Sequence, residues 1–128
     1  VDGIEQPDPL TPDDQAVIVS VKDMGLVIIS GCAHAGIINT LKYARELTGI
    51  HKVHAVVGGF HLAGPLYESC IEPTVSALEE FNPDYLVPTH CTGWKAIHEC
   101  ARRMPAAFIQ NSVGTRLLFG SHPATQGE

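Results

Sequence analysis

The sequence predicts an α/β fold whose elements follow the order β-β-α-β-α-β-α-β-β. Three apolar runs, at residues 26–30, 53–57 and 85–87, each lead into a short loop and then into a segment with helical periodicity. Their spacing is close to the roughly 30 residues of one strand–helix–strand unit. Strands with this period run parallel, so their carboxyl ends meet at one edge of the sheet, where α/β proteins place their ligands.

The two N-terminal strands are expected to form a hairpin. Residues 16–22 alternate around Val17, Val19 and Val21, as in a strand with one buried face. Residues 22–25, with the sequence Lys-Asp-Met-Gly, favour a tight turn into the buried strand at 26–30.

Three segments repeat apolar residues at the period of a helix. They are residues 36–47, the segment between Pro73 and Pro83, and residues 93–103. Gly49 is suited to end the first helix, and Pro73 is suited to the first turn of the second. Thr92 is expected to cap the third helix at its N-terminus.

The ends of the chain are expected to be less regular. Residues 107–110 and 115–119 are predicted as two closing strands around a turn at 111–114. Residues 1–14 are rich in proline and aspartate and are interpreted as a loop or arm. Residues 15–120 then form a single domain, and residues 121–128 a frayed tail.

Composition excludes several classes of function. The 128 residues carry a formal net charge of −6 without a basic cluster, which argues against nucleic-acid binding. The apolar stretches are far shorter than the roughly 18 residues that span a membrane, and no signal peptide is expected. The four cysteines form no CxxC pair, so a reducing cytoplasm is expected. They are Cys32, Cys70, Cys91 and Cys100.

Three histidines stand at equivalent points, each in the loop after a predicted strand. His34, His61 and His90 lie 27 and 29 positions apart. Neutral imidazole binds zinc, iron, nickel or manganese, so a shared metal site is one interpretation and ordinary surface packing the other. Cys32 and Cys91 lie beside two of these histidines and are interpreted as small buried hydrophobes, with metal ligation as the alternative. The remaining histidines are interpreted as packing or surface residues: His51, His54, His98 and His122.

The segment around Lys95 offers a candidate anion site. A helix start carries free N–H groups and partial positive charge, so Thr92 and Lys95 are candidate contacts for a phosphate or carboxylate. An ordinary capped helix with a solvated lysine explains the same residues. Ser112 is a candidate polar contact to substrate or part of a turn. The pair Gly58-Gly59 matches neither a dinucleotide fingerprint nor a P-loop, so nucleotide binding is only weakly indicated.

Three strings, in this order, resemble one family. They are Gly-Cys-Ala-His-Ala-Gly-Ile-Ile-Asn at 31–39, Gly-Gly-Phe-His-Leu at 58–62 and Pro-Thr-His-Cys-Thr-Gly at 88–93. The sequence thereby resembles the metallo-β-lactamase superfamily, in the branch of metal-dependent hydrolases related to dihydropterin-ribofuranosylaminobenzene-phosphate synthase. The string Asp-Asp-Gln-Ala at 13–16 also resembles that branch, and the match runs to about Phe119.

This resemblance implies an αββα sandwich with a metal site at its edge. It implies that His34 and His90 are metal ligands, with zinc as the expected metal and iron or manganese as alternatives. His61 stands near the point where many members have a metal-bridging aspartate. It is therefore expected to act in catalysis, as a replacement ligand or as a contact to the ligands or the substrate.

The family's His-x-His-x-Asp-His string has no counterpart in this sequence. The resemblance therefore implies the C-terminal half of the fold. Because a catalytic metal takes about three protein ligands, the chain alone is expected to bind metal weakly and to hydrolyse little.

Two functions are carried forward. The first is the C-terminal half of a hydrolase that attacks an anionic, phosphorylated small molecule through metal-bound hydroxide. The alternative is a catalytically inactive fragment that serves as a binding or scaffold module. Half a sandwich would expose an apolar sheet face, so a homo-oligomer or a complementing N-terminal half is the expected partner, with no nucleic acid and no membrane.

Overall fold

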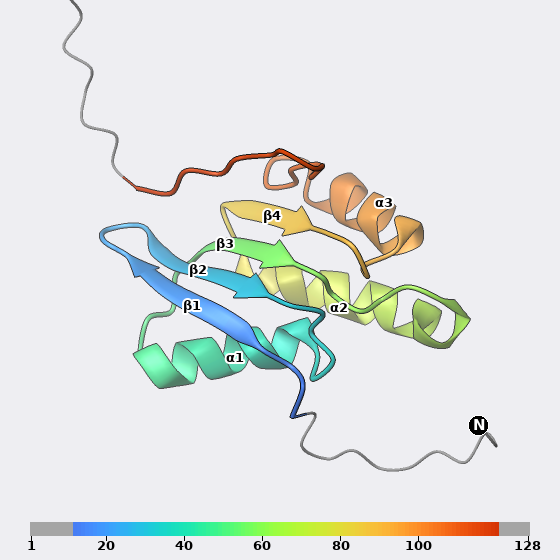
Figure 1. Cartoon of the computed structure of the whole chain (residues 1–128), viewed down its shortest axis with the longest axis horizontal. Helices are drawn as coiled ribbons and strands as arrows, with labels where there is room; N and C mark the ends of the chain where they lie inside the picture. The colour runs from blue at the N-terminus through green and yellow to red at the C-terminus, as the bar shows by residue number, and fades with distance from the viewer. Residues whose placement is uncertain (1–11, 121–128) are drawn as a thin grey trace, which may run out of the picture.

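The computed structural model describes residues 12–120 of the 128-residue chain. It contains four strands, three α-helices and one 3₁₀ turn (Figure 1). In chain order these are β1 Ala16–Val21, β2 Gly25–Ser30, α1 Ile37–Thr48, β3 Val53–Gly58, η1 Pro65–Tyr67, α2 Glu68–Phe81, β4 Tyr85–Pro88 and α3 Trp94–Arg103. The α/β class is confirmed. The predicted arm up to residue 11 and the predicted tail lie outside the described residues.

The strands form one sheet in the order β1-β2-β3-β4. β1 pairs antiparallel with β2, whereas β2, β3 and β4 run parallel. The three parallel strands therefore end at the same edge, on the right in Figure 1. This arrangement is the one expected from the spacing of the apolar runs.

The predicted hairpin between β1 and β2 is confirmed. The Met24 amide donates to the Val21 carbonyl at 3.1 Å, and Asp23 adopts a left-handed conformation with φ 62°. Gly25 has φ 116°, and a Cβ there would lie 2.5 Å from the Lys52 carbonyl oxygen. Only glycine fits this position because both its conformation and its surroundings exclude a side chain.

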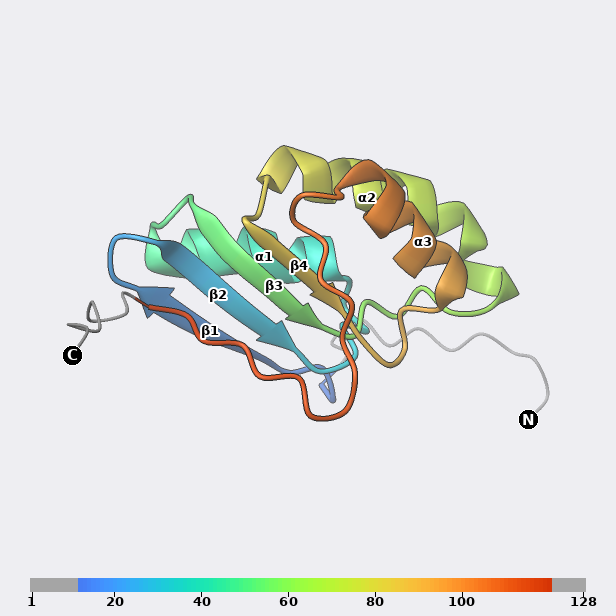
Figure 2. The same cartoon turned by 90° about the horizontal axis from the view of Figure 1, so that it is seen from above.

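All three helices lie on one face of the sheet, as Figure 2 shows from above. The core fills the space between them, and its fully buried side chains are mostly aliphatic. They include Leu26, Ile28, Leu41, Val56, Val75, Leu78 and Leu86. Within residues 12–120, the helices are all too short or too polar to span a membrane.

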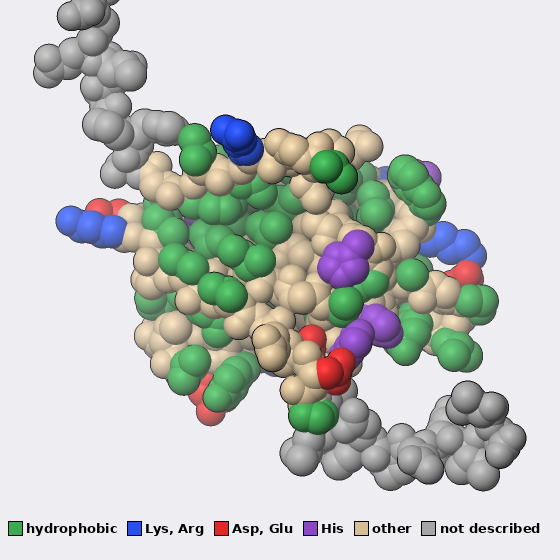
Figure 3. All heavy atoms as spheres, viewed as in Figure 1, with side chains coloured by type: hydrophobic (Ala, Val, Ile, Leu, Met, Phe, Trp, Pro, Cys, Tyr) green, Lys and Arg blue, Asp and Glu red, His purple; other side chains and the backbone are tan. Residues whose placement is uncertain are grey.

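The opposite face of the sheet is apolar, and it is exposed along β1 and at Ile29 of β2, whereas Val27 of the same face is buried. Val17 pairs with Ile29, and Val19 pairs with Val27, so these side chains share one face. Val17, Val19 and Ile29 are 57%, 42% and 43% exposed. Figure 3 shows the resulting patch of hydrophobic side chains over the sheet.

The predicted start of the second helix is wrong. α2 begins at Glu68, directly after η1, so Pro73 lies inside the helix rather than in its first turn. Pro65, which opens η1, gives the sequence signal that was assigned to Pro73. The predicted end before Pro83 is confirmed, since Asn82 leaves the helix in the left-handed conformation.

Thr92 is not the N-cap of α3. Gly93 occupies that position with φ 79°, and a Cβ on Gly93 would lie 2.9 Å from the Cα atom of Ala63. Thr92 is fully buried, and its hydroxyl accepts a hydrogen bond from the Phe60 amide at 3.2 Å. Through this hydrogen bond, Thr92 connects the loop after β4 to the loop after β3.

The prediction of two closing strands is also wrong. Residues 107–110 make one bridge to β4, in which the Leu86 amide donates to Ala107 at 2.8 Å and the Ile109 amide donates to Leu86 at 2.9 Å. Residues 115–119 form no strand. An alternating apolar pattern fits any extended segment that rests on one side, and here the backbone contacts β4 at a single residue.

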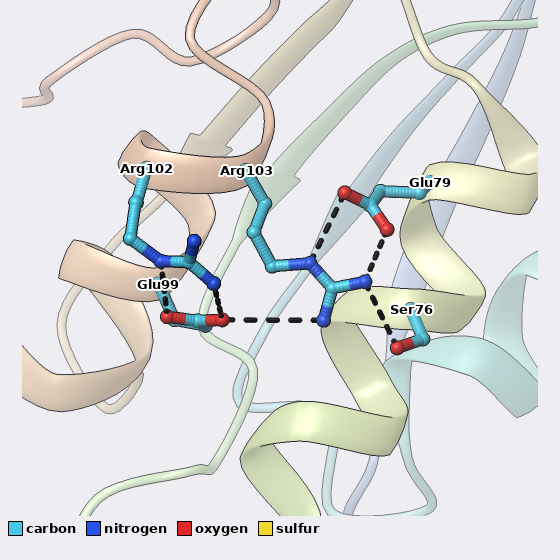
Figure 4. A network of polar contacts seen from close by, with 5 residues as sticks. All are labelled: Ser76, Glu79, Glu99, Arg102 and Arg103. Atoms are coloured by element: carbon cyan, nitrogen blue, oxygen red, sulfur yellow. Dashed lines mark hydrogen bonds and ion pairs between the residues drawn. The ribbon is translucent and has the colours of Figure 1, made fainter.

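Arg103 joins α3 to α2 (Figure 4). Its Nε donates to Oε1 of Glu79 at 3.1 Å, and its Nη2 donates to Oγ of Ser76 at 3.0 Å. Arg102, one residue earlier, pairs only with Glu99 of its own helix among the described residues. The two neighbouring arginines thus have different roles, one between helices and one within a helix.

Candidate metal centre

The loops that follow β2, β3 and β4 lie side by side because the backbone pairing continues beyond the strands. The Gly59 amide donates to the Gly31 carbonyl at 2.9 Å, and the Thr89 amide donates to the Gly58 carbonyl at 2.8 Å. These loops carry His34, His61 and His90. Figure 3 shows histidine side chains beside the apolar patch, at the edge where the parallel strands end.

Gly59 permits the close approach of the second and third loops. A Cβ at this position would lie 2.4 Å from Sγ of Cys91 and 2.9 Å from Cε1 of His90. Real Cβ atoms do not make such contacts, so a side chain here would displace both residues. The glycine pair at 58–59 is therefore a packing requirement of the edge.

Cys32, His90 and Cys91 form a cluster whose ligand atoms all lie within 4.8 Å of one another. Sγ of Cys32 is 3.2 Å from Nε2 of His90. Both cysteines are free and only partly buried, unlike Cys100, which is fully buried. Burial is the largest influence on the Cys91 thiol and raises its pKa.

His34 is held by a carboxylate at the other side of the edge. Its Nδ1 lies 2.5 Å from Oδ2 of Asp13, and this hydrogen bond is the main cause that lowers the pKa of Asp13. Asp14 accepts a hydrogen bond from the Ala35 amide at 2.9 Å. The two aspartates of the string at 13–16 therefore orient the His34 loop and leave Nε2 of His34 for another partner.

His61 packs against His34. The ring centroids are 4.5 Å apart, and the centroids of the His61 and Tyr67 rings are 4.9 Å apart. His61 has φ 49°, which is unusual for a residue with a side chain. Its Nδ1 is buried and has no hydrogen-bond partner among the described residues. A buried nitrogen without a partner is costly and fits a group that is completed by a ligand.

The donor set fits a divalent metal. Imidazole nitrogen and cysteine sulfur are the ligands that zinc and its neighbours prefer. The structure places the three predicted histidines at one edge but divides their contacts. The rings of His34 and His61 make a T-shaped contact, while His90 lies beside the two cysteines. Cys32 and Cys91 were interpreted from the sequence as small buried hydrophobes, with metal ligation as the alternative. Their positions beside His34 and His90 were the indication that they belong to the candidate metal centre.

The predicted substrate contacts have different surroundings. Thr92 is fully buried. Lys95 is exposed at the start of α3 and pairs with Glu68 of α2. Ser112 is exposed and lines a cleft of about 580 Å³ together with His90, Trp94 and other residues of α3 and its flanking loops.

The histidines that were interpreted as packing or surface residues fit that role where the structure describes them. His54 is buried, with Nδ1 2.7 Å from Oδ2 of Asp84. His51 and His98 are exposed, and His122 lies outside the described residues.

A mixed sheet with helices on one face and imidazole and thiol groups at its parallel edge defines an α/β domain with a candidate metal centre. Comparison with known proteins makes the class specific. The fold matches the crystal structure of a metal-dependent hydrolase of the β-lactamase superfamily, with a TM-score of 0.75 and 34% identity. The match covers 84% of this chain and 41% of that chain.

The chain also has relatives in sequence. The chain is 39% identical over 107 residues to 7,8-dihydropterin-6-methyl-4-(β-D-ribofuranosyl)-aminobenzene-5'-phosphate synthase of Methanocaldococcus jannaschii. An uncharacterized protein of the same organism is 35% identical over 71 residues, which are 56% of this chain and 26% of that protein. No family model matches the sequence.

The motif-based resemblance is thereby confirmed. The chain has a homologue in the aminobenzene-phosphate synthase and a structural neighbour in the metallo-β-lactamase superfamily, each matching 84% of its length. It spans about a third of the synthase, 36% of its length. The neighbour's metal dependence and the edge cluster together support a divalent metal in this fold.

Proposed function

We propose that this chain is the C-terminal half of a metal-dependent hydrolase with the metallo-β-lactamase fold, acting on an anionic, phosphorylated small molecule. The main support is the group of imidazole and thiol side chains at the parallel edge of the sheet. The synthase relative, whose name contains a 5'-phosphate, supports the choice of substrate class.

His34 and His90 would hold the metal, for which zinc is the first candidate. A divalent metal bound there supplies a water of lowered pKa and thus a hydroxide nucleophile near neutral pH. Asp13 fixes the orientation of His34 through Nδ1, and Thr89 Oγ1 lies 3.0 Å from Nδ1 of His90. Both histidines thus have the outer hydrogen bond that ligating imidazoles usually make.

His61 is the proposed proton-transfer group. Its ring contacts the rings of His34 and Tyr67, and it lines a cavity of about 290 Å³ with both of them. Its buried Nδ1 has no hydrogen-bond partner among the described residues, so the ring can carry a proton within this cavity.

The proposed substrate site is the 580 Å³ cleft beside His90. Ser112 offers a hydroxyl there, and the exposed Trp94 offers an apolar surface for a planar group. Lys95 does not line this cleft and pairs with Glu68 of α2, so it could contact only an anionic group that extends beyond the cleft and replaces Glu68. Thr92 is not proposed as a substrate contact, because its hydroxyl is buried and already accepts a hydrogen bond from the Phe60 amide.

The open apolar face of the sheet supports a partner. A second sheet, from the N-terminal half of the fold, would cover Val17, Val19 and Ile29 as in a sandwich. Without that half, a second copy of the chain would cover the same face. The four free cysteines support a reducing compartment such as the cytoplasm.

A chimera tests the function. The N-terminal part of the metal-dependent hydrolase matched in structure is joined to this chain, and hydrolysis of aryl phosphate esters is measured with and without zinc. We expect zinc-dependent activity that falls at least about a hundredfold in His34→Ala and His90→Ala. His51→Ala, an exposed histidine away from the edge, is the control. A metal-loaded chimera without activity, or with activity indifferent to both histidines, favours the scaffold function.

A further inference from the structure

Two cysteines stand beside the proposed metal ligands at the edge of the sheet. Cys32 lies two residues before His34 in the loop after β2, and Cys91 directly follows His90 in the loop after β4. We propose that Cys32 and Cys91 are a reversible dithiol–disulfide pair, oxidised by a small peroxide such as hydrogen peroxide. His34 and His90 keep their role as the proposed metal ligands. The reaction of the cysteines needs neither substrate nor metal, so it goes beyond the hydrolase function.

The two sulfur atoms are close enough to form a bond. They belong to the cluster whose ligand atoms all lie within 4.8 Å of one another, whereas the S–S bond is about 2.05 Å long. The sulfur atoms must therefore approach by roughly 3 Å at most, which is about the distance that one change of rotamer moves a cysteine sulfur. The Cys91 thiol already donates to the Cys32 carbonyl oxygen at 3.5 Å, so the Cys91 side chain points towards the loop of Cys32.

Backbone hydrogen bonds keep the two loops in this position. The Gly59 amide donates to the Gly31 carbonyl at 2.9 Å, and the Thr89 amide donates to the Gly58 carbonyl at 2.8 Å. The loop after β3 thus connects the loops after β2 and β4. A Cβ on Gly59 would lie 2.4 Å from Sγ of Cys91, so the glycine leaves the space that this sulfur needs. A pair held in place in this way reacts faster than the same two groups on an unfolded chain.

The other two cysteines are placed differently. Cys32 and Cys91 are partly exposed, and the third member of their cluster, His90, is exposed, so a small oxidant has access to the pair. Cys70 is exposed on α2, Cys100 is fully buried in α3, and neither belongs to the cluster. The fold therefore favours the bond between Cys32 and Cys91 over the other pairings.

The reaction consumes two thiols and one peroxide. One sulfur attacks a peroxide oxygen, the O–O bond breaks, and a sulfenic acid forms while the leaving hydroxide takes the thiol proton and becomes water. The other sulfur attacks the sulfenic sulfur, the S–O bond breaks, and the second hydroxide leaves with the second thiol proton as water. The sulfur atoms lose two electrons, which reduce the peroxide.

The bond would join residues that are 59 positions apart and would link the loop of His34 to the loop of His90. A thiol reductant reverses it by exchange and becomes a disulfide itself. Transient disulfides of this kind occur in reducing compartments, where they act in redox sensing.

Peroxide oxidation of the whole chain, freed of metal with a chelator, tests the proposal. We expect an equimolar amount of hydrogen peroxide to remove two of the four thiols and two hydrogen atoms of mass, and peptide mapping to find Cys32 bonded to Cys91. Unfolding the chain in urea beforehand should slow the formation of this bond by more than about tenfold. Dithiothreitol should restore both thiols.

Serine variants identify the two partners. Cys32→Ser and Cys91→Ser should each abolish the bond and leave a sulfenic acid on the remaining cysteine, which dimedone traps. Cys70→Ser, which changes an exposed cysteine outside the cluster, is the matched control and should keep the bond and its rate of formation. If a serine variant does not fold, peptide mapping of the unmodified chain decides alone.

A first disulfide between any other two cysteines, or one that links two chains, overturns the proposal. So do thiols at Cys32 and Cys91 that survive the oxidant, oxidation of either to a sulfinic acid without a bond, or a bond that forms equally fast in urea. No substrate and no metal enter these measurements. A catalytically inactive chain can therefore still contain the pair, and an active one can lack it.

Discussion

Gly59 is a single residue on which the geometry of the metal edge depends. A Cβ there would meet Sγ of Cys91 at 2.4 Å, so Gly59→Ala forces the loops after β3 and β4 apart. We expect the free energy of unfolding to fall by about 1 to 3 kcal/mol, as for other overpacked sites, and metal affinity to fall with it. Urea unfolding and cobalt titration measure the two effects.

Gly31→Ala provides the comparison for this substitution. Gly31 lies in the loop after β2, and its nearest contact for an added Cβ is the Gln15 carbonyl oxygen at 3.3 Å. We expect a clearly smaller loss of stability and of metal binding. Equal losses in the two variants would show that the contact with Cys91 and His90 is not the cause.

Cys100 predicts a pH dependence of stability. Burial raises the pKa of this thiol from 9.0 to about 11. As the pH rises from 9 to 11, the unfolded thiol loses its proton first, so the unfolded state gains stability relative to the folded state. We expect the free energy of unfolding to fall with a slope of at most about 1.4 kcal/mol per pH unit from this group.

The measurement is denaturant unfolding at several pH values, with Cys100→Ala as the variant. The variant is less stable at every pH because it leaves a cavity, but it should lose this part of the slope. An unchanged slope in Cys100→Ala would contradict the assignment to Cys100. In the folded chain, a thiol reagent should modify the exposed Cys70 well before Cys100.

At the scale of elements, Pro73 determines how α2 should respond to substitution. Pro73 has no N–H to donate to the Ser69 carbonyl, and an interior proline costs a helix about 3 kcal/mol before the gain from a stiffer unfolded chain. We therefore expect Pro73→Ala to raise the free energy of unfolding by about 1 kcal/mol or more. Pro65→Ala is the control, since a proline that opens a turn sacrifices no hydrogen bond. A loss of stability in Pro73→Ala would indicate that the helix starts later.

The contact between α2 and α3 depends on Arg103. Arg103 is 19% exposed and contacts Glu79 and Ser76 of α2, whereas Arg102 is 70% exposed and pairs within α3 (Figure 4). Arg103→Met should lower the free energy of unfolding by about 1 kcal/mol, because charged hydrogen bonds between elements are lost. Arg102→Met should cost a few tenths at most. Thermal or urea unfolding of both variants gives the comparison, and equal effects would contradict it.

The elements that the sequence predicted well are those with two agreeing signals. α1 combines a helical apolar period with Gly49, which ends the helix in the left-handed conformation. The start of α2 was misplaced because Pro65 and Pro73 both carry a helix-start signal. Leu66, which lies between the two prolines, is exposed, so the apolar period did not show at which proline the helix begins. The prediction of the closing strands was wrong because alternation of apolar and polar residues does not by itself show whether a segment pairs with β4.

At the scale of the whole molecule, topology was predictable and side-chain pairing was not. Strands with a 30-residue period run parallel, so the sequence could place His34, His61 and His90 at one edge. Which of them meet depends on how closely the loops approach. The contact of His90 with Cys32 and Cys91 requires the space at Gly59, which no residue pattern reports.

The exposed apolar residues of the sheet face predict that the chain self-associates. A contiguous apolar face is rarely left exposed by a monomer, so we expect the chain alone to self-associate at micromolar concentration. Val17→Lys combined with Val19→Lys should shift it towards the monomer, because two charges on this face oppose sheet-to-sheet packing. Both valines are already partly exposed, so the core should tolerate the change.

Light scattering coupled to size-exclusion chromatography measures this shift. Leu47→Lys is the matched control, because Leu47 is an exposed apolar residue of α1, away from the sheet face. We expect this variant to associate like the unmodified chain. If the unmodified chain is a stable monomer at micromolar concentration, the sheet face needs no cover and the proposed sandwich loses its physical basis. If Leu47→Lys dissociates the oligomer and the sheet-face variant does not, association occurs through the helices. Self-association that only the sheet-face variant abolishes would show that this face requires a second sheet, whether from another copy or from the N-terminal half.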